Sequence, residues 1–356
     1  MSLPFLQPYF GLSNSLQTAQ ASAGGGGVGG WVELGRTSGS GTTNIDVTSL
    51  VNKRYYMILT SAFQTGNPDV KLQVGNGSFD TGSNYASRWS EVGGADSTQT
   101  SASNLIYDPI GATFERRFGV GYVANKSDKE KLFINHNVAS DGTSAGVSPR
   151  RAEMVGKWAN TASVIDRIRF LSVGANFTSS DEMVVLGWDP ADTHTTNFWT
   201  ELYSGDLSAG AATNIDSGTI TAKKYLWVQL YTQQSVDSDY LVTFNGDNAG
   251  TTYARRYMHD GVTEITGVSQ ANFTLVSRPA NLPQFTNMFI INNSANEKLV
   301  IAHQVNQMTA GAGTAPTRTE YVGKWANTSA QITSINVKSG SGNLATKTIL
   351  KVWGSD

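Results

Sequence analysis

The sequence contains no cysteine among its 356 residues. This absence excludes disulfide bonds, thiolate nucleophiles and cysteine-ligated metal sites together. Charged residues are also few, at 15% of the chain, and 26 Lys and Arg nearly balance 28 Asp and Glu. A nucleic-acid-binding domain carries a basic patch or stripe, so this composition argues against a nucleic-acid partner.

Long apolar runs are absent as well. No stretch approaches the ~18 consecutive apolar residues that mark a membrane-spanning helix. The opening segment has no basic region followed by a long apolar run, so we do not interpret it as a secretory signal peptide. We therefore expect no membrane partner.

Motifs that carry chemistry are missing too. The sequence has no G-x-S-x-G and no P-loop, and its one glycine-rich stretch, "GGGGVGG", follows no predicted strand and is interpreted as a flexible tether. The acidic residues that match between the two halves of the chain form no pair suited to glycoside hydrolysis. We therefore predict that the protein is not an enzyme and binds no cofactor.

What the sequence does contain favours β-structure. It has 37 Gly, 14 Phe, 13 Tyr and 8 Trp, with abundant Ser, Thr and Asn. Apolar residues alternate in short segments, as at Leu226, Val228 and Leu230, and turn signals such as "GNG" and "NGD" separate these segments. This pattern predicts an all-β protein made of antiparallel sandwiches.

The chain also repeats itself. The segment "MVGKWANTAS" at residues 154–163 recurs as "YVGKWANTSA" at residues 321–330. Residues 122–161 and 289–328 align without gaps and share 20 of 40 residues. Matches this dense indicate a tandem duplication.

The duplication predicts two similar domains. We place a first β-sandwich at residues 31–188, a linker at 189–198 and a second β-sandwich at 199–356. Each repeat is long enough for eight strands with loops, so a jelly-roll-like topology is preferred. The order of the strands is not predicted.

Residues 1–30 differ from both repeats and are predicted to form an extended apolar arm followed by the glycine tether. An apolar arm needs a surface to dock on, which a neighbouring subunit, a larger assembly or its own domain would supply. The expected anchoring residues are Leu3, Phe5, Leu6, Tyr9, Phe10 and Leu12.

The repeated segment allows two interpretations. Trp158 and Trp325, helped by Asn160 and Asn327, could form an aromatic platform on which a sugar ring stacks. The alternative, which we favour, is that the two tryptophans are packing residues copied with their domain.

The histidines are interpreted as structural. His136 and His303 occupy equivalent positions, but neither copy offers an H-x-H, an H-E-x-x-H or an acidic cluster. His194, beside Asp189 and Asp192, could bind a cation, although the same residues describe a solvated linker. We therefore predict no metal site.

Two Arg and Glu pairs also recur, with a spacing that places both side chains on one face of a strand. These are Arg151 with Glu153 and Arg318 with Glu320. We expect them to form ion pairs on the surface or at a subunit contact.

The apolar arm "LPFLQPYFGLSNSLQTAQ", the glycine tether and the cysteine-free tandem sandwiches together resemble structural proteins of bacterial viruses, particularly those on the outside of tailed-phage particles. The phrases "VGKWANT" and "TNFWTEL" add to this resemblance. It implies a virion protein of the decoration, cement or fibre type, anchored by its arm. It implies no cofactor and no chemistry.

The expected partners are copies of the chain itself, with a trimer among the options, and other virion proteins. Three alternatives stay open. The first is a receptor- or carbohydrate-binding tail protein that recognises a host surface glycan. The others are a double jelly-roll major capsid protein and a subunit of a cellular extracellular filament or surface layer.

Overall fold

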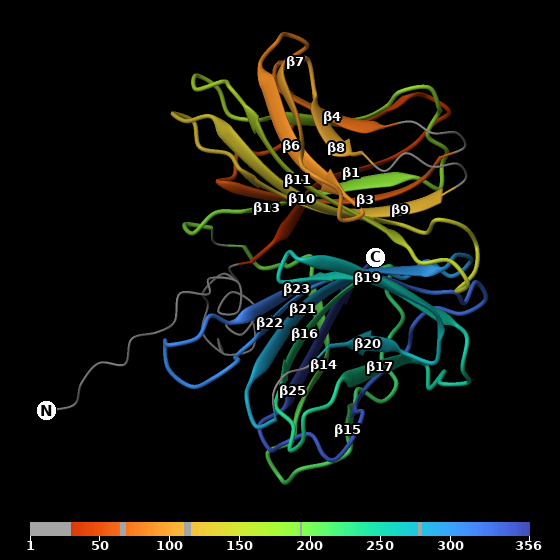
Figure 1. The fold of residues 1–356 in the computed structure, drawn as a ribbon. Coiled ribbons are helices and arrows are strands. Elements are labelled where there is room, and N and C mark those ends of the chain that lie inside the picture. Colours follow the sequence, from red (N-terminus) through yellow and green to blue (C-terminus); the bar gives the residue numbers. More distant parts are fainter. Residues whose placement is uncertain (1–29, 65–68, 110–114, 193, 277–279) are drawn as a thin grey trace, which may run out of the picture.

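The computed structural model confirms an all-β protein built from two similar antiparallel β-sandwiches, stacked one on the other (Figure 1). Within the described part of the chain there is no helix that could cross a membrane. The arm predicted at residues 1–30 lies outside the described residues, apart from its last one. The described residues are 30–64, 69–109, 115–192, 194–276 and 280–356.

The first sandwich pairs a large sheet with a small one. The large sheet has the order β1-β13-β3-β9-β10-β11-β6-β7, and the small sheet the order β2-β12-β4-β5, with β8 attached to β4. The strands are β1 (Val32–Ser38), β2 (Asn44–Val47), β3 (Tyr55–Gln64), β4 (Val70–Asn76), β5 (Ser78–Phe79), β6 (Tyr85–Glu91), β7 (Ser97–Ala102), β8 (Leu105–Asp108), β9 (Glu115–Ala124), β10 (Lys131–Ala139), β11 (Arg150–Trp158), β12 (Arg167–Ser172) and β13 (Glu182–Trp188).

The second sandwich repeats this strand order, except that β20 takes the place of β8 and no strand of the described residues corresponds to β5. Its large sheet runs β14-β25-β16-β21-β22-β23-β18-β19 and its small sheet β15-β24-β17-β20. A bulge near the start of β1 recurs at the same place in β14. The strands are β14 (Thr200–Asp206), β15 (Asn214–Asp216), β16 (Tyr225–Thr232), β17 (Tyr240–Phe244), β18 (Tyr253–His259), β19 (Thr263–Gln270), β20 (Phe273–Leu275), β21 (Gln284–Ile291), β22 (Lys298–Asn306), β23 (Thr317–Trp325), β24 (Ile335–Ser339) and β25 (Ile349–Ser355).

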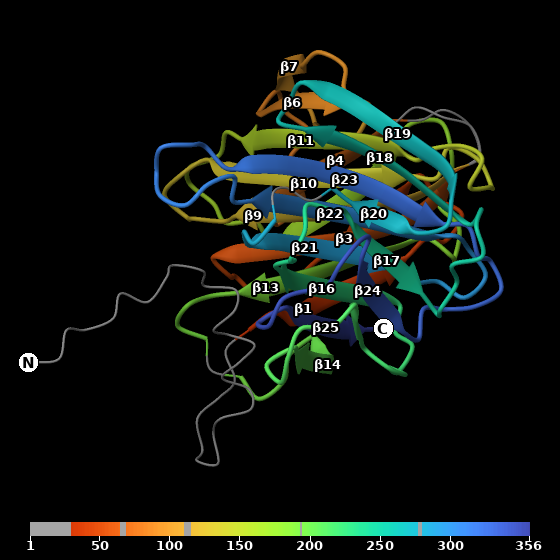
Figure 2. The same cartoon turned by 60° about the horizontal axis from the view of Figure 1, so that its bottom comes forward.

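The two large sheets pack against each other, so the molecule has four layers with the small sheets outermost (Figures 1 and 2). Strand β3 explains why the sequence contains short continuous apolar runs beside alternating ones. Tyr56 and Ile58 point into the core of their own sandwich, whereas Met57 and Leu59 point into the interface between the sandwiches. A strand buried on both faces needs a continuous apolar run instead of an alternating one.

Aromatic side chains of the second sandwich dominate this interface. Trp227 stacks on Phe289 with ring centroids 5.6 Å apart and lies 5.2 Å from Trp353. Trp199, which follows the linker, packs 5.7 Å from Trp227. Each buried aromatic removes a large apolar area from water, so these rings contribute strongly to the apolar cluster that the two repeats share.

Equivalent residues of the two repeats are buried to different extents at the interface. Leu132 on β10 is 56% exposed, whereas its equivalent Leu299 on β22 is 1% exposed and packed in the interface. The same contrast separates Ile134, at 51%, from Ile301, at 2%. The two large sheets are therefore in contact over only part of their faces. The part of the first sheet that carries Leu132 and Ile134 stays exposed, whereas the equivalent part of the second sheet is buried.

A pair of matched variants tests this asymmetry. Leu299→Ala is expected to lower the free energy of unfolding by about 2–5 kcal/mol, because it leaves a cavity in a packed interface. Leu132→Ala removes the same atoms from an exposed position and is expected to change it by less than about 0.5 kcal/mol. Urea denaturation followed by tryptophan fluorescence measures both. Equal effects would contradict the asymmetric packing.

Candidate functional site

The two repeated tryptophans are core residues. Trp158 and Trp325 are each 1% exposed, and their indole Nε1 groups donate hydrogen bonds to Asp80 and Asp247, both at 2.7 Å. A sugar ring needs an exposed aromatic face on which to stack. The hypothesis of a ligand platform is thus corrected for both rings, and the packing interpretation describes them.

The repeated asparagines close turns. Asn160 Oδ1 accepts hydrogen bonds from the backbone N–H groups of Ala162 and Ser163, and Asn327 does the same in the second repeat. The backbone carbonyls of Asn160 and Asn327 accept hydrogen bonds from Lys131 and Lys298, each at 2.8 Å. These polar groups are occupied within each domain. The predicted anchoring residues of the arm lie outside the described residues.

The outward-facing residues of the same segment differ between the copies. Val155 is 50% exposed, but Val322 is buried in the interface. Lys157 pairs with an exposed glutamate, whereas the buried Lys324 donates hydrogen bonds to the carbonyls of Ser140, at 2.8 Å, and Gly142, at 3.0 Å. The inward-facing residues of the segment thus pack in the same way in both copies. The outward-facing residues contact the other domain only in the second copy.

The loop at residues 140–149 completes that contact. Pro149 O accepts a hydrogen bond from Arg256 Nε at 2.7 Å, and Ala145 O accepts one from the backbone N–H of Ser269. Both donors belong to the second sandwich. The first sandwich thus reaches over β18, β19 and β23 and fixes the relative orientation of the domains.

A buried carboxylate ties the opposite edge of the interface. Glu182 Oε1 accepts hydrogen bonds from Tyr225 Oη at 2.8 Å, Lys224 Nζ at 2.9 Å and Arg36 Nη1 at 3.2 Å. Burial alone would raise the pKa of Glu182, but the hydrogen bond and charge of Lys224, with smaller effects of Tyr225 and Arg36, lower the pKa below 4.5. The carboxylate is ionised at neutral pH.

The interface also holds two equivalent histidines, each partly exposed, which we call the histidine centre. Nδ1 of His136 lies 3.2 Å from Nε2 of His303, and the ring centroids are 4.2 Å apart. Each histidine is paired in the sheet with a glutamate, His136 with Glu153 and His303 with Glu320. One ligand atom from each of His136, Glu153 and His303 lies within 4.8 Å of the other two. The duplication thus brings together what neither repeat contains alone.

The two predicted Arg and Glu pairs border this centre. Arg151 Nη1 binds Glu153, and Arg318 Nη1 lies 3.1 Å from Glu320 Oε1. Arg151 also reaches Glu264 of the second sandwich at 3.4 Å. Glu320 Oε2 is buried and has no hydrogen-bond partner among the described residues.

Burial sets the protonation of the centre. Burial, followed by the charge of Arg151, lowers the pKa of His136 from 6.5 to about 4. Burial and the neighbouring His136 lower the pKa of His303 to about 3. Burial and the charge of Glu153 raise the pKa of Glu320. Both imidazoles are therefore neutral at pH 7.

The linker carboxylates have partners of their own. Asp192 binds Lys53, and Asp189 lies 3.8 Å from Arg54. His194 Nε2 lies 3.4 Å from Asn197. Both linker carboxylates therefore contact basic residues of the first sandwich.

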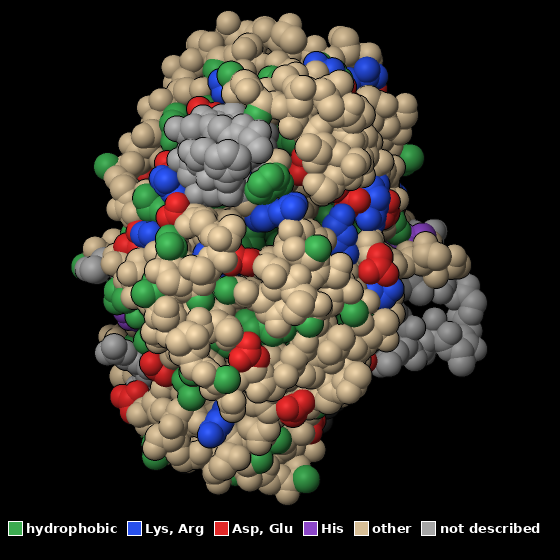
Figure 3. All heavy atoms as spheres, turned by 90° about the vertical axis from the view of Figure 1, so that its right-hand side faces the viewer, with side chains coloured by type: hydrophobic (Ala, Val, Ile, Leu, Met, Phe, Trp, Pro, Cys, Tyr) green, Lys and Arg blue, Asp and Glu red, His purple; other side chains and the backbone are tan. Residues whose placement is uncertain are grey.

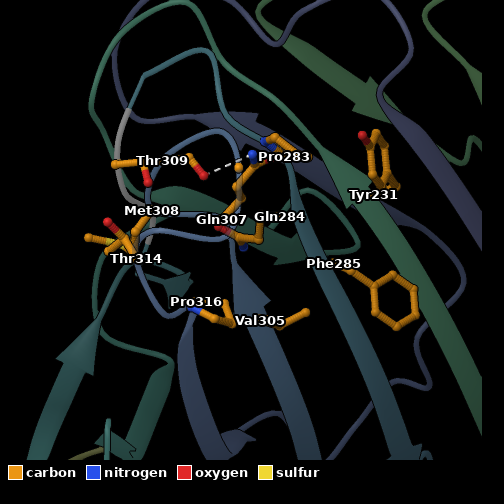
Figure 4. A pocket seen from close by; sticks show the side chains of 11 residues that line it. Tyr231, Pro283, Gln284, Phe285, Val305, Gln307, Met308, Thr309, Thr314 and Pro316 are labelled. Carbon is orange, nitrogen blue, oxygen red and sulfur yellow. Dashed lines mark hydrogen bonds between the residues drawn. The ribbon is translucent and has the colours of Figure 1, made fainter.

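An exposed apolar row crosses the large sheet of the second sandwich. Ile349, Tyr231, Phe285 and Val305 are neighbours on four adjacent strands and are each between 36% and 41% exposed. A hollow of about 410 Å³ adjoins the row, between β21, β22 and the loop after β22 (Figure 4). Tyr231, Phe285 and Val305 line it, together with Met308 from that loop.

The equivalent row of the first sandwich is covered. Glu182, Ser61, Phe118 and Val138 stand at the corresponding positions of β13, β3, β9 and β10, and all four are buried. Phe118 packs 6.4 Å from Tyr225 of the second sandwich. In the first repeat this part of the large sheet is covered by the second sandwich. In the second repeat the equivalent part is apolar and exposed.

Sequence reasoning did not find the histidine centre, because it considered each copy by itself. The signal available in the sequence was that His136 and His303, with Glu153 and Glu320, are retained at the same spacing in both repeats. Their meeting depends on which sheet faces touch, and the sequence does not state that.

The Glu182 cluster gives a prediction on pH. Because its folded pKa is lowered, the contribution of Glu182 to stability is present above about pH 4.5 and is lost as pH falls through the folded pKa. Glu182→Gln is expected to lower the free energy of unfolding at pH 7 by about 1.5–3 kcal/mol. The difference from wild type should shrink in urea titrations as the pH falls below about 4.5, because the carboxyl is protonated first in the unfolded chain and then, at the lowered pKa, in the folded protein.

Glu130→Gln is the matched control, since Glu130 pairs with Lys157 at the surface. An exposed pair of this kind contributes about 0–1 kcal/mol. A Glu182→Gln deficit that stays constant down to pH 2 would contradict the assignment of an ionised, interface-stabilising carboxylate.

Comparisons with known proteins name no family. No family model matches the chain, and no curated protein matches it. Mouse laminin alpha1 chain, domains LG4-5, aligns over 98% of this chain and 93% of its own, with 10% identity and a TM-score of 0.19. A Pseudomonas aeruginosa FadL homologue aligns over 86% and 91%, with 8% identity and a TM-score of 0.10. Similarity this distant carries no argument about function.

Proposed function

We propose that this chain is a non-enzymatic structural protein of a tailed-phage particle, of the decoration, cement or fibre type. Its arm at residues 1–30 attaches it to the capsid or tail, and its sandwiches associate with further copies of the chain. The observation that carries this proposal is the exposed apolar row Ile349–Tyr231–Phe285–Val305. Contiguous exposed apolar surface marks protein contacts.

The first repeat supports self-association over other partners. There, the corresponding row is covered by a β-sandwich of nearly the same fold. A surface shaped by duplication to accept one sandwich is suited to accept another. The exposed Leu132, Ile134 and Val155 of the first sandwich offer a second apolar face, beside a hollow of about 480 Å³.

Surface charge is consistent with a protein that contacts proteins. One side of the molecule carries Lys, Arg, Asp and Glu interspersed, with hydrophobic side chains in small groups (Figure 3). The formal net charge is −2. Binding of nucleic acid depends on concentrated positive charge, which this balance does not supply.

Carbohydrate binding loses its main support with the burial of Trp158 and Trp325. A cellular filament or surface-layer subunit would use the same apolar row. Genomic neighbourhood separates the two, because portal, terminase and capsid genes beside this gene would indicate a virus.

Removing the arm tests attachment. A variant lacking residues 1–30 is expected to keep the circular dichroism spectrum and melting temperature of the full chain, because both sandwiches lie outside the deleted segment. It should fail to join particles in a co-purification with phage. Incorporation at the wild-type level would contradict the anchoring role.

Changing the apolar row tests self-association. Phe285→Lys is expected to weaken it about tenfold or more, because a charge replaces an apolar anchor at the centre of the row. Analytical ultracentrifugation over a concentration series measures the effect. Val262→Lys is the control, since Val262 is 82% exposed and lies outside the row. Equal association of both variants and wild type would contradict the assigned surface.

A further inference from the structure

The geometry points to a transition-metal site between the two sandwiches, formed by His136, His303 and Glu153 and suited to Zn²⁺. Neutral imidazoles and a carboxylate are ligands that zinc prefers. The site goes beyond the proposed function and does not depend on it. Its ligands come from both repeats, so a bound ion would hold the two domains together.

The spacing of the histidines fits this ion. A tetrahedral Zn²⁺ with Zn–N distances of about 2.0–2.1 Å places two ligand nitrogens about 3.3–3.4 Å apart. Nδ1 of His136 and Nε2 of His303 are 3.2 Å apart. The carboxylate of Glu153 lies within 4.8 Å of both and needs a shift of up to about 1.5 Å to complete the triangle. Glu153 is partly exposed and can make that adjustment.

The strands hold these ligands in place. His136 and Glu153 are direct neighbours across β10 and β11, and His303 projects from β22 of the facing sheet. Sites on strands are more precise than sites on loops. Val138 and Ile301 are buried on one side of the histidine pair, and this packing fixes the distance between the sheets.

The other side of the pair is open to solvent. A shallow hollow of about 250 Å³ is lined by Ile134, His136, Glu153 and Val155. An ion and its water can reach the ligands from this hollow. Water would complete the coordination, as it does in zinc sites with three protein ligands.

A second carboxylate lies near the proposed site. Glu320 is the partner of His303 in the sheet, and its Oε2 is buried without a hydrogen-bond partner among the described residues. An unpaired buried carboxylate oxygen is costly, and a nearby cation would offset that cost. Glu320 is not one of the three proposed ligands, and its charge would stabilise the ion from nearby.

Arg151 competes for the same carboxylate. Its guanidinium pairs with Glu153 and also with Glu264. Metal binding would release the contact to Glu153 while Glu264 retains the arginine. Arg151→Gln is therefore expected to tighten metal binding, an effect that adventitious binding to a surface histidine would not show.

The test uses the untagged full chain, stripped with EDTA and titrated with ZnCl₂ by isothermal calorimetry. One equivalent is expected to bind, and Co²⁺ in its place should give the visible absorption bands of a tetrahedral site. His136→Gln and His303→Gln should each weaken Zn²⁺ binding by at least about 100-fold, since even the loss of an outer partner costs 10–100-fold. Both variants keep a polar side chain, which favours folding.

His259→Gln is the matched control, because His259 bonds to Thr319 and lies outside the site. It should bind Zn²⁺ as wild type does. A zinc-dependent rise in melting temperature should appear in wild type and His259→Gln and be absent from His303→Gln. Absence of binding by folded wild-type protein, or affinity unchanged in the two site variants, would overturn the proposal.

Discussion

The structure depends on the packing of two large sheets whose outer faces are apolar over part of their area. Burying this apolar area removes it from water, and each repeat covers part of the outer face of the other. Trp227, Phe289 and Trp353 anchor the contact, and Glu182 and Lys324 fix its two edges with buried polar bonds. The four-layer architecture follows from this one burial.

The same contact decides what each copy of the repeat can do. Residues that point into a domain kept their role in both copies, as Trp158 and Trp325 show through equal bonds to Asp80 and Asp247. Some residues that point outward have different surroundings in the two copies although the residue is the same, as the exposed Leu132 and the buried Leu299 show. The exposed row around Phe285 exists because the facing domain does not reach that part of the second sheet.

The candidate sites also arise from the contact. His136 and His303 look structural when each repeat is read alone, since a single copy supplies one histidine and one glutamate. Face-to-face packing joins the two copies and produces a compact set of nitrogen and oxygen atoms. The tryptophans illustrate the opposite case, because they look like a binding platform in sequence and are buried by the small sheet of their own domain.

The sequence by itself determined the all-β class, the duplication and the core role of alternating residues, because local periodicity and turn chemistry encode them. It also encoded the Arg151–Glu153 and Arg318–Glu320 pairs, because the two residues of each pair lie two positions apart on the same strand. Only the tertiary structure decided which outer faces meet, which of Leu132 and Leu299 is buried, and that two distant histidines touch. Those outcomes depend on the relative placement of two finished domains, and no local pattern in either repeat records it.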